Sequence, residues 1–193
     1  VPHDSGLGPL LFLPFVNDLP DRIKNSIKMF ADDPKVWTAI KEAADSEGLQ
    51  QDLDKLREWT NEWQLNLKKC KVMHIAHSCK TEYDMGPENN RVKLQETDGE
   101  RDLGVFITRD LKPAMQCEKA AAKAMSMLGM INRHFKNLDV AGFLIIYKTY
   151  VRPHLEYAVQ AWSPYLIKDI QCLERVQRRA TKLVTSIRKK PYE

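Results

Sequence analysis

The sequence predicts an α+β fold followed by an all-helical region, and three observations carry this prediction. Two short apolar runs, 26–31 and 35–40, flank an acidic pair, which is the pattern of a β-hairpin. Large apolar residues recur at helical spacing in the next segment. From residue 111 onward every apolar pattern is helical, so we expect one part over 1–110 and a second part over 111–193.

The first part begins with a segment rich in glycine and proline. Residues 7–18 are apolar, with a Gly-Pro dipeptide leading in, and predict a buried helix or its entry turn. The two apolar runs that follow end on either side of Asp32 and Asp33, so we expect these acids at the turn of a hairpin. Acids concentrate again at 42–47, where a helix N-terminus stabilises negative charge.

The other elements of the first part are predicted from spacing and turn residues. A helix should follow the acids, because large apolar residues recur there every three to four positions. These residues are Leu49, Leu53, Leu56 and Trp63, with Trp59 and Leu67 broadening the stripe. Residues 71–75 predict a strand, and residues 103–108 predict another. Between them, 78–101 is polar with Gly-Pro and Asp-Gly pairs, which predicts a loop or loose hairpin.

The second part is expected to form helices at 117–135, 140–151, 153–162 and 167–187. Proline is tolerated in a first helical turn, which is where Pro113 and Pro153 stand. Several aromatic residues of these helices can stack on nucleic-acid bases. At helical spacing, however, core positions are the favoured interpretation for them. These aromatic residues are Tyr147, Tyr150, Tyr157 and Trp162.

Composition limits the class of protein. With 193 residues, 43% of them hydrophobic, the chain can form a core in one domain, or in one domain with an appendage. It has no run of 18 apolar residues and no secretory signal pattern, so we expect neither a membrane span nor secretion. The four cysteines are widely scattered, which indicates free thiols. Because Val1 is not a methionine, we expect a fragment or a processed piece.

Basic residues outnumber acids near the C-terminus, although the formal net charge is only +4. Four of them recur every three to four positions, which places them on one helix face. They are Arg175, Arg178, Arg179 and Lys182. Such a face can neutralise phosphates, and an ordinary solvated helix face is the alternative interpretation.

A zinc site is a weaker possibility at Cys70, His74, His77 and Cys79. Successive side chains of a strand alternate between its faces. His74 and His77 would then lie on opposite faces, which opposes tetrahedral coordination, so we do not predict a zinc site there.

The most informative feature is the acidic pair Asp32 and Asp33 directly after an apolar run. Mg²⁺ prefers carboxylate and phosphate oxygens. Two such metals can stabilise both the attacking and the leaving oxygen of a phosphoryl transfer. An acidic pair before Pro34 is also typical of a solvated turn. The surrounding motifs decide for the metal-binding interpretation.

Several further motifs accompany the acidic pair in a defined order. They are Leu-Gly-Pro-Leu-Leu-Phe (7–12), Asn-Asp-Leu-Pro (17–20), Phe-Ala-Asp-Asp (30–33), Trp-Gln-Leu (63–65), Lys-Cys-Lys-Val-Met-His-Ile (69–75), Asp-Leu-Gly-Val (102–105) and the aromatic segment 150–158. In order and spacing, the chain resembles the reverse transcriptases of non-LTR retrotransposons, particularly the jockey-type lineage. The resemblance implies the C-terminal part of a right-hand polymerase palm, followed by a thumb-like helical region.

The resemblance also implies roles for individual residues. Asp32 and Asp33 would belong to the catalytic centre and hold Mg²⁺ or Mn²⁺. Lys69 matches a lysine near the leaving pyrophosphate, with a surface lysine as the alternative. Leu103 and Gly104 match a primer-grip turn, although the residues alone are also those of a strand with a glycine bulge. The segment that would contact nucleotide and template includes His3, Ser5, Gly8 and Pro9.

The implied parent reaction is DNA synthesis from deoxynucleoside triphosphates on an RNA template with a DNA primer, in the nucleus or the cytoplasm. The sequence departs from the family pattern where Gln, Gly, a bulkier residue and Thr are expected. The residues found there are His3, Asp4, Gly6 and Pro34. Asp4 adds negative charge beside an anionic substrate, and together these departures favour a decaying copy of the element.

The third catalytic aspartate of this family, and the fingers, would lie on segments before Val1. We therefore expect that the chain alone does not polymerise. Two other hypotheses remain open: a non-catalytic nucleic-acid-binding remnant that uses the basic helical end, and an inert polypeptide.

Overall fold

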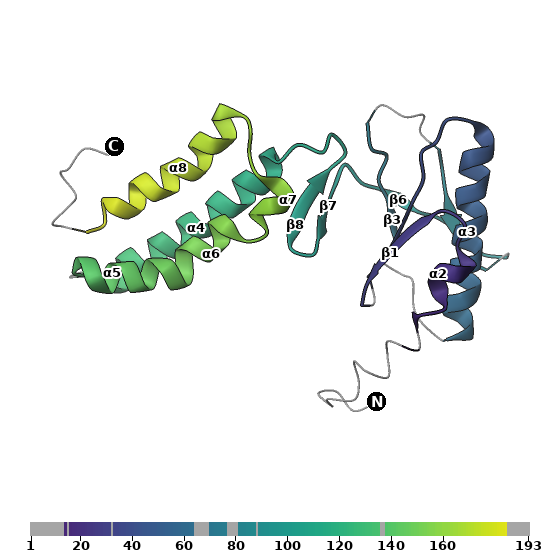
Figure 1. Ribbon diagram of the computed structural model, residues 1–193, viewed down its shortest axis with the longest axis horizontal. Coiled ribbons are helices and arrows are strands. Elements are labelled where there is room, and N and C mark those ends of the chain that lie inside the picture. The colour runs from purple at the N-terminus through teal and green to yellow at the C-terminus, as the bar shows by residue number, and fades with distance from the viewer. Residues whose placement is uncertain are drawn as a thin grey trace. The chain divides into compact units, whose positions relative to one another are not determined.

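The computed structural model describes residues 14, 16–31, 33–63, 70–76, 81–87, 89–135 and 138–184. The chain divides into two compact units, Val1–Thr97 and Asp98–Glu193. Each is described by itself, and Figure 1 labels their helices and strands. Helices and short, mostly antiparallel sheets occur together, so the predicted α+β class is confirmed. None of the described helices combines the length and the apolar character that crossing a membrane requires.

The first unit is built around a hairpin and one long helix. Helix α2 (Leu19–Arg22) leads into strands β1 (Ser26–Phe30) and β2 (Asp33–Trp37), which pair antiparallel. The predicted hairpin is thus confirmed. Its second strand begins at Asp33 and includes Pro34, so it starts two residues earlier than the apolar pattern indicated. A proline is tolerated there because a strand of a two-stranded sheet always has a free edge.

Helix α3 (Ala43–Glu62) confirms the helix that the apolar stripe predicted. Its N-terminus is capped because a carboxylate oxygen of Asp45 accepts hydrogen bonds from the Lys41 and Glu42 amides. The core of the unit gathers on one side of this helix, from α2, α3 and β4. It comprises Val16, Leu19, Ile23, Leu56, Trp59 and Met85. Trp63 lies just after the helix end and is 40% exposed, so the helix stops before the last residues of the predicted stripe.

The rest of the first unit consists of very short strands. The predicted strand 71–75 is reduced to β3 (Lys71–Val72), which pairs in parallel with β6 (Gln95–Glu96). Between them, β4 (Asp84–Met85) and β5 (Val92–Lys93) pair antiparallel, as the loose hairpin predicted for this polar region requires. The side chain of Gln50 on α3 accepts from the Asp84 amide and donates to the Asp84 carbonyl, which attaches β4 to the helix.

The second unit begins with a hairpin that the sequence pattern did not reveal. Strands β7 (Gly99–Asp102) and β8 (Val105–Thr108) pair antiparallel. The expected strand 103–108 is therefore wrong at its start, because Leu103 and Gly104 form the turn instead. The sequence of β7, Gly-Glu-Arg-Asp, has no alternation of apolar and polar residues. The strand therefore forms through pairing with β8 rather than through its own pattern.

Helices make up the remainder of the described second unit. They are α4 (Ala114–His134), α5 (Val140–Ile146), the π-helical turn η1 (Tyr147–Val151), α6 (Arg152–Glu156), α7 (Val159–Trp162) and α8 (Ile167–Thr181). Helix α4 packs against α6 and α8 (Figure 1). The side chains that pack in this core come from all three of these helices and from the residues beside them. The fully buried ones are Ala124, Leu128, Val151, Val176 and Val184.

The helices break at other places than predicted. Helices α5, η1 and α6 run on from Val140 to Glu156 without interruption, where two separate helices were expected. Pro153 cannot follow a regular α-helical turn, because its ring crowds the carbonyl four residues back. The preceding turn is the wider π type, in which the Arg152 amide donates to the Tyr147 carbonyl. The real break comes at Ala158, whose φ of 51° is left-handed.

The boundary between the units also differs from the composition shift near residue 111. The contacts place it between Thr97 and Asp98, so the β7–β8 hairpin belongs with the helices. A specific hydrogen bond supports this grouping: the Phe106 amide of β8 donates to the side-chain oxygen of Gln116 on α4, at 2.9 Å. Composition marks where helices start, whereas packing decides which elements share a core.

Candidate nucleic-acid interface and acidic hairpin

The hairpin of β1 and β2 presents one of the two predicted metal-binding acids at its tip. Phe30 pairs with Asp33, and between them Ala31 has a left-handed φ of 52°. Asp33 is exposed, and Phe30 beside it is 62% exposed. Asp32 lies outside the described residues. The hairpin therefore carries the Asp33 carboxylate on its solvent side, at the position where the strand begins.

The donor chemistry of Asp33 suits a hard divalent cation such as Mg²⁺. In the part of the chain that the structure describes, no three His, Cys, Asp or Glu side chains come together in a way that could hold a metal ion. A metal held at this hairpin would thus need further ligands beyond the described residues.

The other predicted residues of the catalytic half, Lys69, His3, Ser5, Gly8 and Pro9, lie outside the described residues, as do His77 and Cys79. His74 is described, and it has a structural role. Its Nε2 lies 3.0 Å from the Thr81 carbonyl oxygen, and its Nδ1 lies 3.4 Å from Glu96 Oε1. His74 therefore ties two segments of the first unit together. For Cys70, which is half-buried, burial raises the pKa of the thiol.

The Leu103–Gly104 turn is unusual in its backbone. Both residues have positive φ, 44° and 89°, as the central residues of a type I′ hairpin turn do. Glycine adopts this geometry freely, but a leucine in the left-handed region costs about 1–2 kcal/mol. The strain must be offset by surrounding contacts.

Those contacts come from Tyr157, which lies at the end of α6. The Tyr157 hydroxyl donates a hydrogen bond of 2.9 Å to the Leu103 carbonyl, across 54 residues of sequence. A Cβ on Gly104 would lie only 3.0 Å from Cε1 of the Tyr157 ring, so a larger residue there would require the ring to shift by a few tenths of an ångström. Tyr157 is held from behind as well, because the buried Trp162 indole donates to its carbonyl at 2.8 Å.

The sequence analysis identified the two segments that carry Leu103–Gly104 and Tyr157, but it did not predict that they are in contact. The Asp-Leu-Gly-Val motif and the aromatic segment 150–158 each stood alone as family features. No local pattern relates residues so far apart, and the only signal was the presence of Gly104 in a short turn-like tetrapeptide.

The four predicted basic residues all lie on the exposed surface of α8 and its C-terminal cap. They are Arg175, Arg178, Arg179 and Lys182. The buried side of the same helix is formed by Val176 and Ala180, together with Asp169. The charged face of α8 is thus separated from an apolar packing face.

The neighbouring helix α4 carries a buried thiol. Burial, with additional effects from Asp169 and Cys172, raises the pKa of the Cys117 thiol to about 11.

The predicted core role of the four aromatic residues is right for two of them. Trp162 is buried, and Tyr147 packs against the core of the second unit. Tyr150 and Tyr157 are 55% and 56% exposed, so their expected core positions are wrong.

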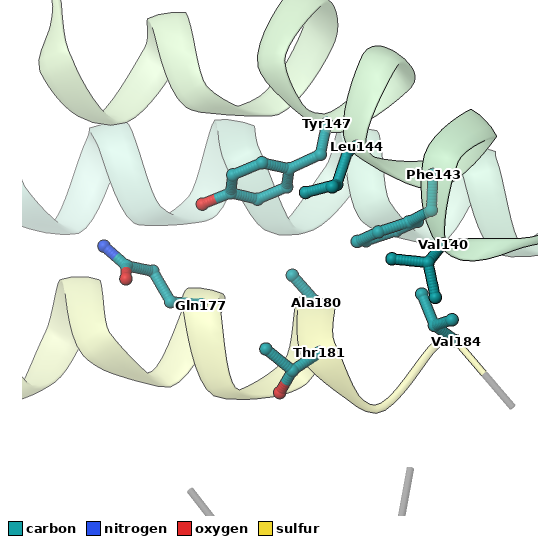
Figure 2. Close-up of a pocket in the computed structure, with 8 residues that line it drawn as sticks. All are labelled: Val140, Phe143, Leu144, Tyr147, Gln177, Ala180, Thr181 and Val184. Atoms are coloured by element: carbon teal, nitrogen blue, oxygen red, sulfur yellow. The ribbon is translucent and has the colours of Figure 1, made fainter. Parts of the chain in front are cut away.

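A cavity that sequence reasoning missed lies between α5–η1 and α8. It has a volume of about 210 Å³. Figure 2 shows Phe143, Leu144 and Tyr147 on one side facing Ala180 and Thr181 on the other. An adjoining groove of about 360 Å³ continues past Tyr147 toward polar side chains. In that groove Arg152 Nε pairs with Glu156 Oε1 at 2.7 Å, so the charge of this arginine is already compensated.

Three known proteins are similar to the chain. One is the probable RNA-directed DNA polymerase from transposon X-element of Drosophila melanogaster, 24% identical over 195 residues, which cover 96% of this chain and 21% of the relative. The others are the RNA-directed DNA polymerases from mobile element jockey of Drosophila melanogaster and Drosophila funebris, 25% and 27% identical, each covering 84% of this chain and 19% of the relative. The chain spans about a fifth of the length of these relatives. No protein-family model and no solved structure matches it.

Proposed function

The chain is a relative of the reverse transcriptases of jockey-type non-LTR retrotransposons, and from this premise we propose that it contains part of the palm and the thumb of such a polymerase. In the complete polymerase, these parts would hold an RNA template and a DNA primer during DNA synthesis from deoxynucleoside triphosphates. The observation that supports this most directly is similarity to a reverse transcriptase over 96% of the chain, which itself contains Phe-Ala-Asp-Asp at residues 30–33.

The proposal assigns the acidic hairpin to metal binding. Asp32 and Asp33 are the residues that would hold Mg²⁺ or Mn²⁺, and Lys69 would lie near the leaving pyrophosphate. When bound, the metal would supply charge stabilisation for phosphoryl transfer. The exposure of the Asp33 side chain at a strand start leaves its oxygens available to a ligand. His3, Ser5, Gly8 and Pro9 would contact nucleotide and template, and Leu103 with Gly104 would contact the primer.

Nucleic-acid binding by the chain itself is assigned to α8. At about 100° per residue, Arg175, Arg179 and Lys182 lie within about 60° of arc, over two helical turns that span about 10 Å. All three are exposed, and none forms an ion pair with another described residue. They lie on a different side of the helix from Val176 and Ala180, which anchor it. A row of available cations on an anchored helix fits a phosphate backbone.

Arg178 differs from these three. It lies about 40° beyond the edge of this row, one turn from Glu174, and both residues take part in an interaction. We therefore assign it a smaller share of the binding.

We expect the affinity for an RNA–DNA hybrid to fall steeply with salt concentration and to require Arg175, Arg179 and Lys182. Changing Arg175, Arg179 and Lys182 together to glutamine should lower the slope of log K against log salt by about 2–3, since each lost phosphate contact removes about 0.9. Fluorescence anisotropy over a salt series measures the slope. The matched control changes the exposed Lys119, Lys123 and Arg133 of α4, which removes the same charge. Equal losses in the two triple variants would contradict the assignment to α8.

Primer extension by the 193 residues alone is expected to be absent with either Mg²⁺ or Mn²⁺. In the described part of the chain no three potential ligands come together, and the resemblance places the third carboxylate on a strand that these residues do not include. Extension of a labelled primer on an RNA template is the measurement, with a complete reverse transcriptase as positive control. Metal-dependent incorporation that disappears in Asp32→Ala would overturn this expectation.

A second candidate function is nucleic-acid binding without any catalysis. The exposed cations of α8 favour it independently of the acidic hairpin. This function predicts that binding to an RNA–DNA hybrid depends on salt. Asp32→Ala and Asp33→Ala should leave this binding unchanged, also when the remainder of a polymerase is supplied.

A further inference from the structure

The Leu103–Gly104 turn combines strain with exposure. An Asn-Gly pair would adopt two successive positive φ angles with little cost, yet the first position is a leucine. Its side chain is 44% exposed, so burial in a core does not explain the choice. A strained, bulky residue at an exposed tip indicates a functional constraint.

The turn is also held by a side chain from a distant segment. Tyr157 donates to the Leu103 carbonyl at 2.9 Å, and its ring faces Gly104 so closely that a Cβ would lie 3.0 Å from Cε1. The Trp162 indole bonds to the carbonyl of Tyr157 at 2.8 Å, and Trp162 is only 5% exposed. The chain then reverses at Ala158 through a left-handed φ of 51°. A buried anchor thus holds Tyr157, and Tyr157 holds the turn.

Neither exposure to solvent nor packing in the core requires a hydroxyl group at Tyr157. Tyr157 is 56% exposed, and an exposed hydroxyl is well solvated by water. Its hydrogen bond to Leu103 instead fixes the direction of the turn's peptide group. The result is a turn, held by Tyr157, that presents the Leu103 side chain to solvent.

We propose that Tyr157 is a positioning residue of the nucleic-acid interface, which holds the Leu103–Gly104 turn in the geometry that receives the 3′ end of a primer strand. The inference rests on the proposed function, because it takes the primer contact of Leu103 and Gly104 from there. It adds that the contact requires a residue of the helical segment. The exposed, apolar Leu103 side chain packs on the sugar of the terminal nucleotide, and Gly104 lets the Tyr157 ring lie close behind the turn.

The test compares two RNA–DNA hybrids of equal duplex length, one blunt and one with a recessed DNA 3′ end. The wild-type chain binds the recessed end more tightly, and Tyr157→Phe lowers that affinity about threefold to tenfold, the range for one lost neutral hydrogen bond. Blunt-hybrid binding, which α8 provides, stays unchanged. Tyr150→Phe is the matched control, since Tyr150 is 55% exposed and also belongs to the helical segment. It should keep the preference for the recessed end.

Two additional readouts separate positioning from folding. In Tyr157→Phe, the amide NMR signals of Leu103, Gly104 and Val105 should shift, while the indole N–H signal of Trp162 stays in place. Leu103→Asn suits the turn better than leucine does, so it should not destabilise the fold, yet it should also abolish the recessed-end preference.

The outcomes distinguish this inference from the proposed function. Salt-dependent binding of both hybrids with no recessed-end preference overturns the role of Tyr157 and leaves the proposed function standing. A preference that survives Tyr157→Phe overturns the role as well. Absence of binding to either hybrid overturns both.

Discussion

Replacing Leu128 with alanine is expected to lower the free energy of unfolding of the second unit by about 2–5 kcal/mol. Leu128 lies on the inner side of α4, is 1% exposed, and belongs to a core cluster with Ala124, Val151 and Val176. Because this cluster joins α4 to α8, the cavity left by the substitution cannot be filled without moving one helix. A urea titration that follows the indole N–H signal of Trp162 reports on this unit specifically.

Met130 provides the control on the same helix. It is 38% exposed, so Met130→Ala removes a side chain of similar size from a partly solvated position. Its cost should stay below about 1 kcal/mol, because little buried area is lost. If Leu128→Ala proved as mild as Met130→Ala, the core described for α4 and α8 would be wrong.

Replacing Asp52 with alanine is expected to destabilise the first unit by about 2–4 kcal/mol. Asp52 lies on α3, is 1% exposed, and one carboxylate oxygen accepts from both the backbone amide and the side-chain amide of Asn25, at 2.7 and 2.9 Å. Its other oxygen pairs with Lys55 at 3.0 Å. The substitution leaves the Asn25 donors without their acceptor at the entry to β1. Urea unfolding that follows the indole signal of Trp59 measures the loss.

The same residue makes the stability of the first unit depend on acid pH. Burial acts to raise the pKa of Asp52, but the hydrogen bonds from Asn25 and Lys55 outweigh it and leave the pKa below its ordinary value of 3.8. The carboxylate therefore stabilises the fold above the pKa of the unfolded chain, and this contribution is lost as pH falls through the lower pKa of the folded state. Unfolding measured between pH 6 and about pH 2 should show it.

The controls for Asp52 are Asp52→Asn and Glu58→Gln. The asparagine variant has no charge to titrate, so its stability should fall less than that of the wild type below about pH 4. Glu58 is exposed on the same helix, and its variant should follow the wild type at every pH. Parallel pH curves for the wild type and Asp52→Asn would contradict the role assigned to Asp52.

Local sequence was enough for the elements that depend on near neighbours. The hairpin around Phe30 and Asp33 was predicted because two apolar runs meet at a turn a few residues long. Helix α3 was predicted because its stripe repeats every three to four residues. The resemblance to jockey-type reverse transcriptases was also evident from ordered motifs in the sequence, and the relatives found are 24–27% identical to the chain.

Local sequence was misleading where a residue from a distant segment determines the local conformation. Residues 103–108 have the composition of a strand, yet Tyr157 holds Leu103 and Gly104 in a turn. Nothing in the spacing of α3 marks Asp52 as buried, and the Asn25 amides that bond to it come from another segment.

The sequence by itself thus determined the resemblance to jockey-type reverse transcriptases, the α+β class, the acidic hairpin and the basic face of α8. Each of these depends on patterns that are local, or on local motifs read in order along the chain, where spacing and composition act directly. Only the tertiary structure decided the break at Ala158, the grouping of the β7–β8 hairpin with the helices, and the meeting of Tyr157 with Leu103. These features depend on contacts across tens of residues, which no periodicity encodes, because they form only when separate elements pack into one core.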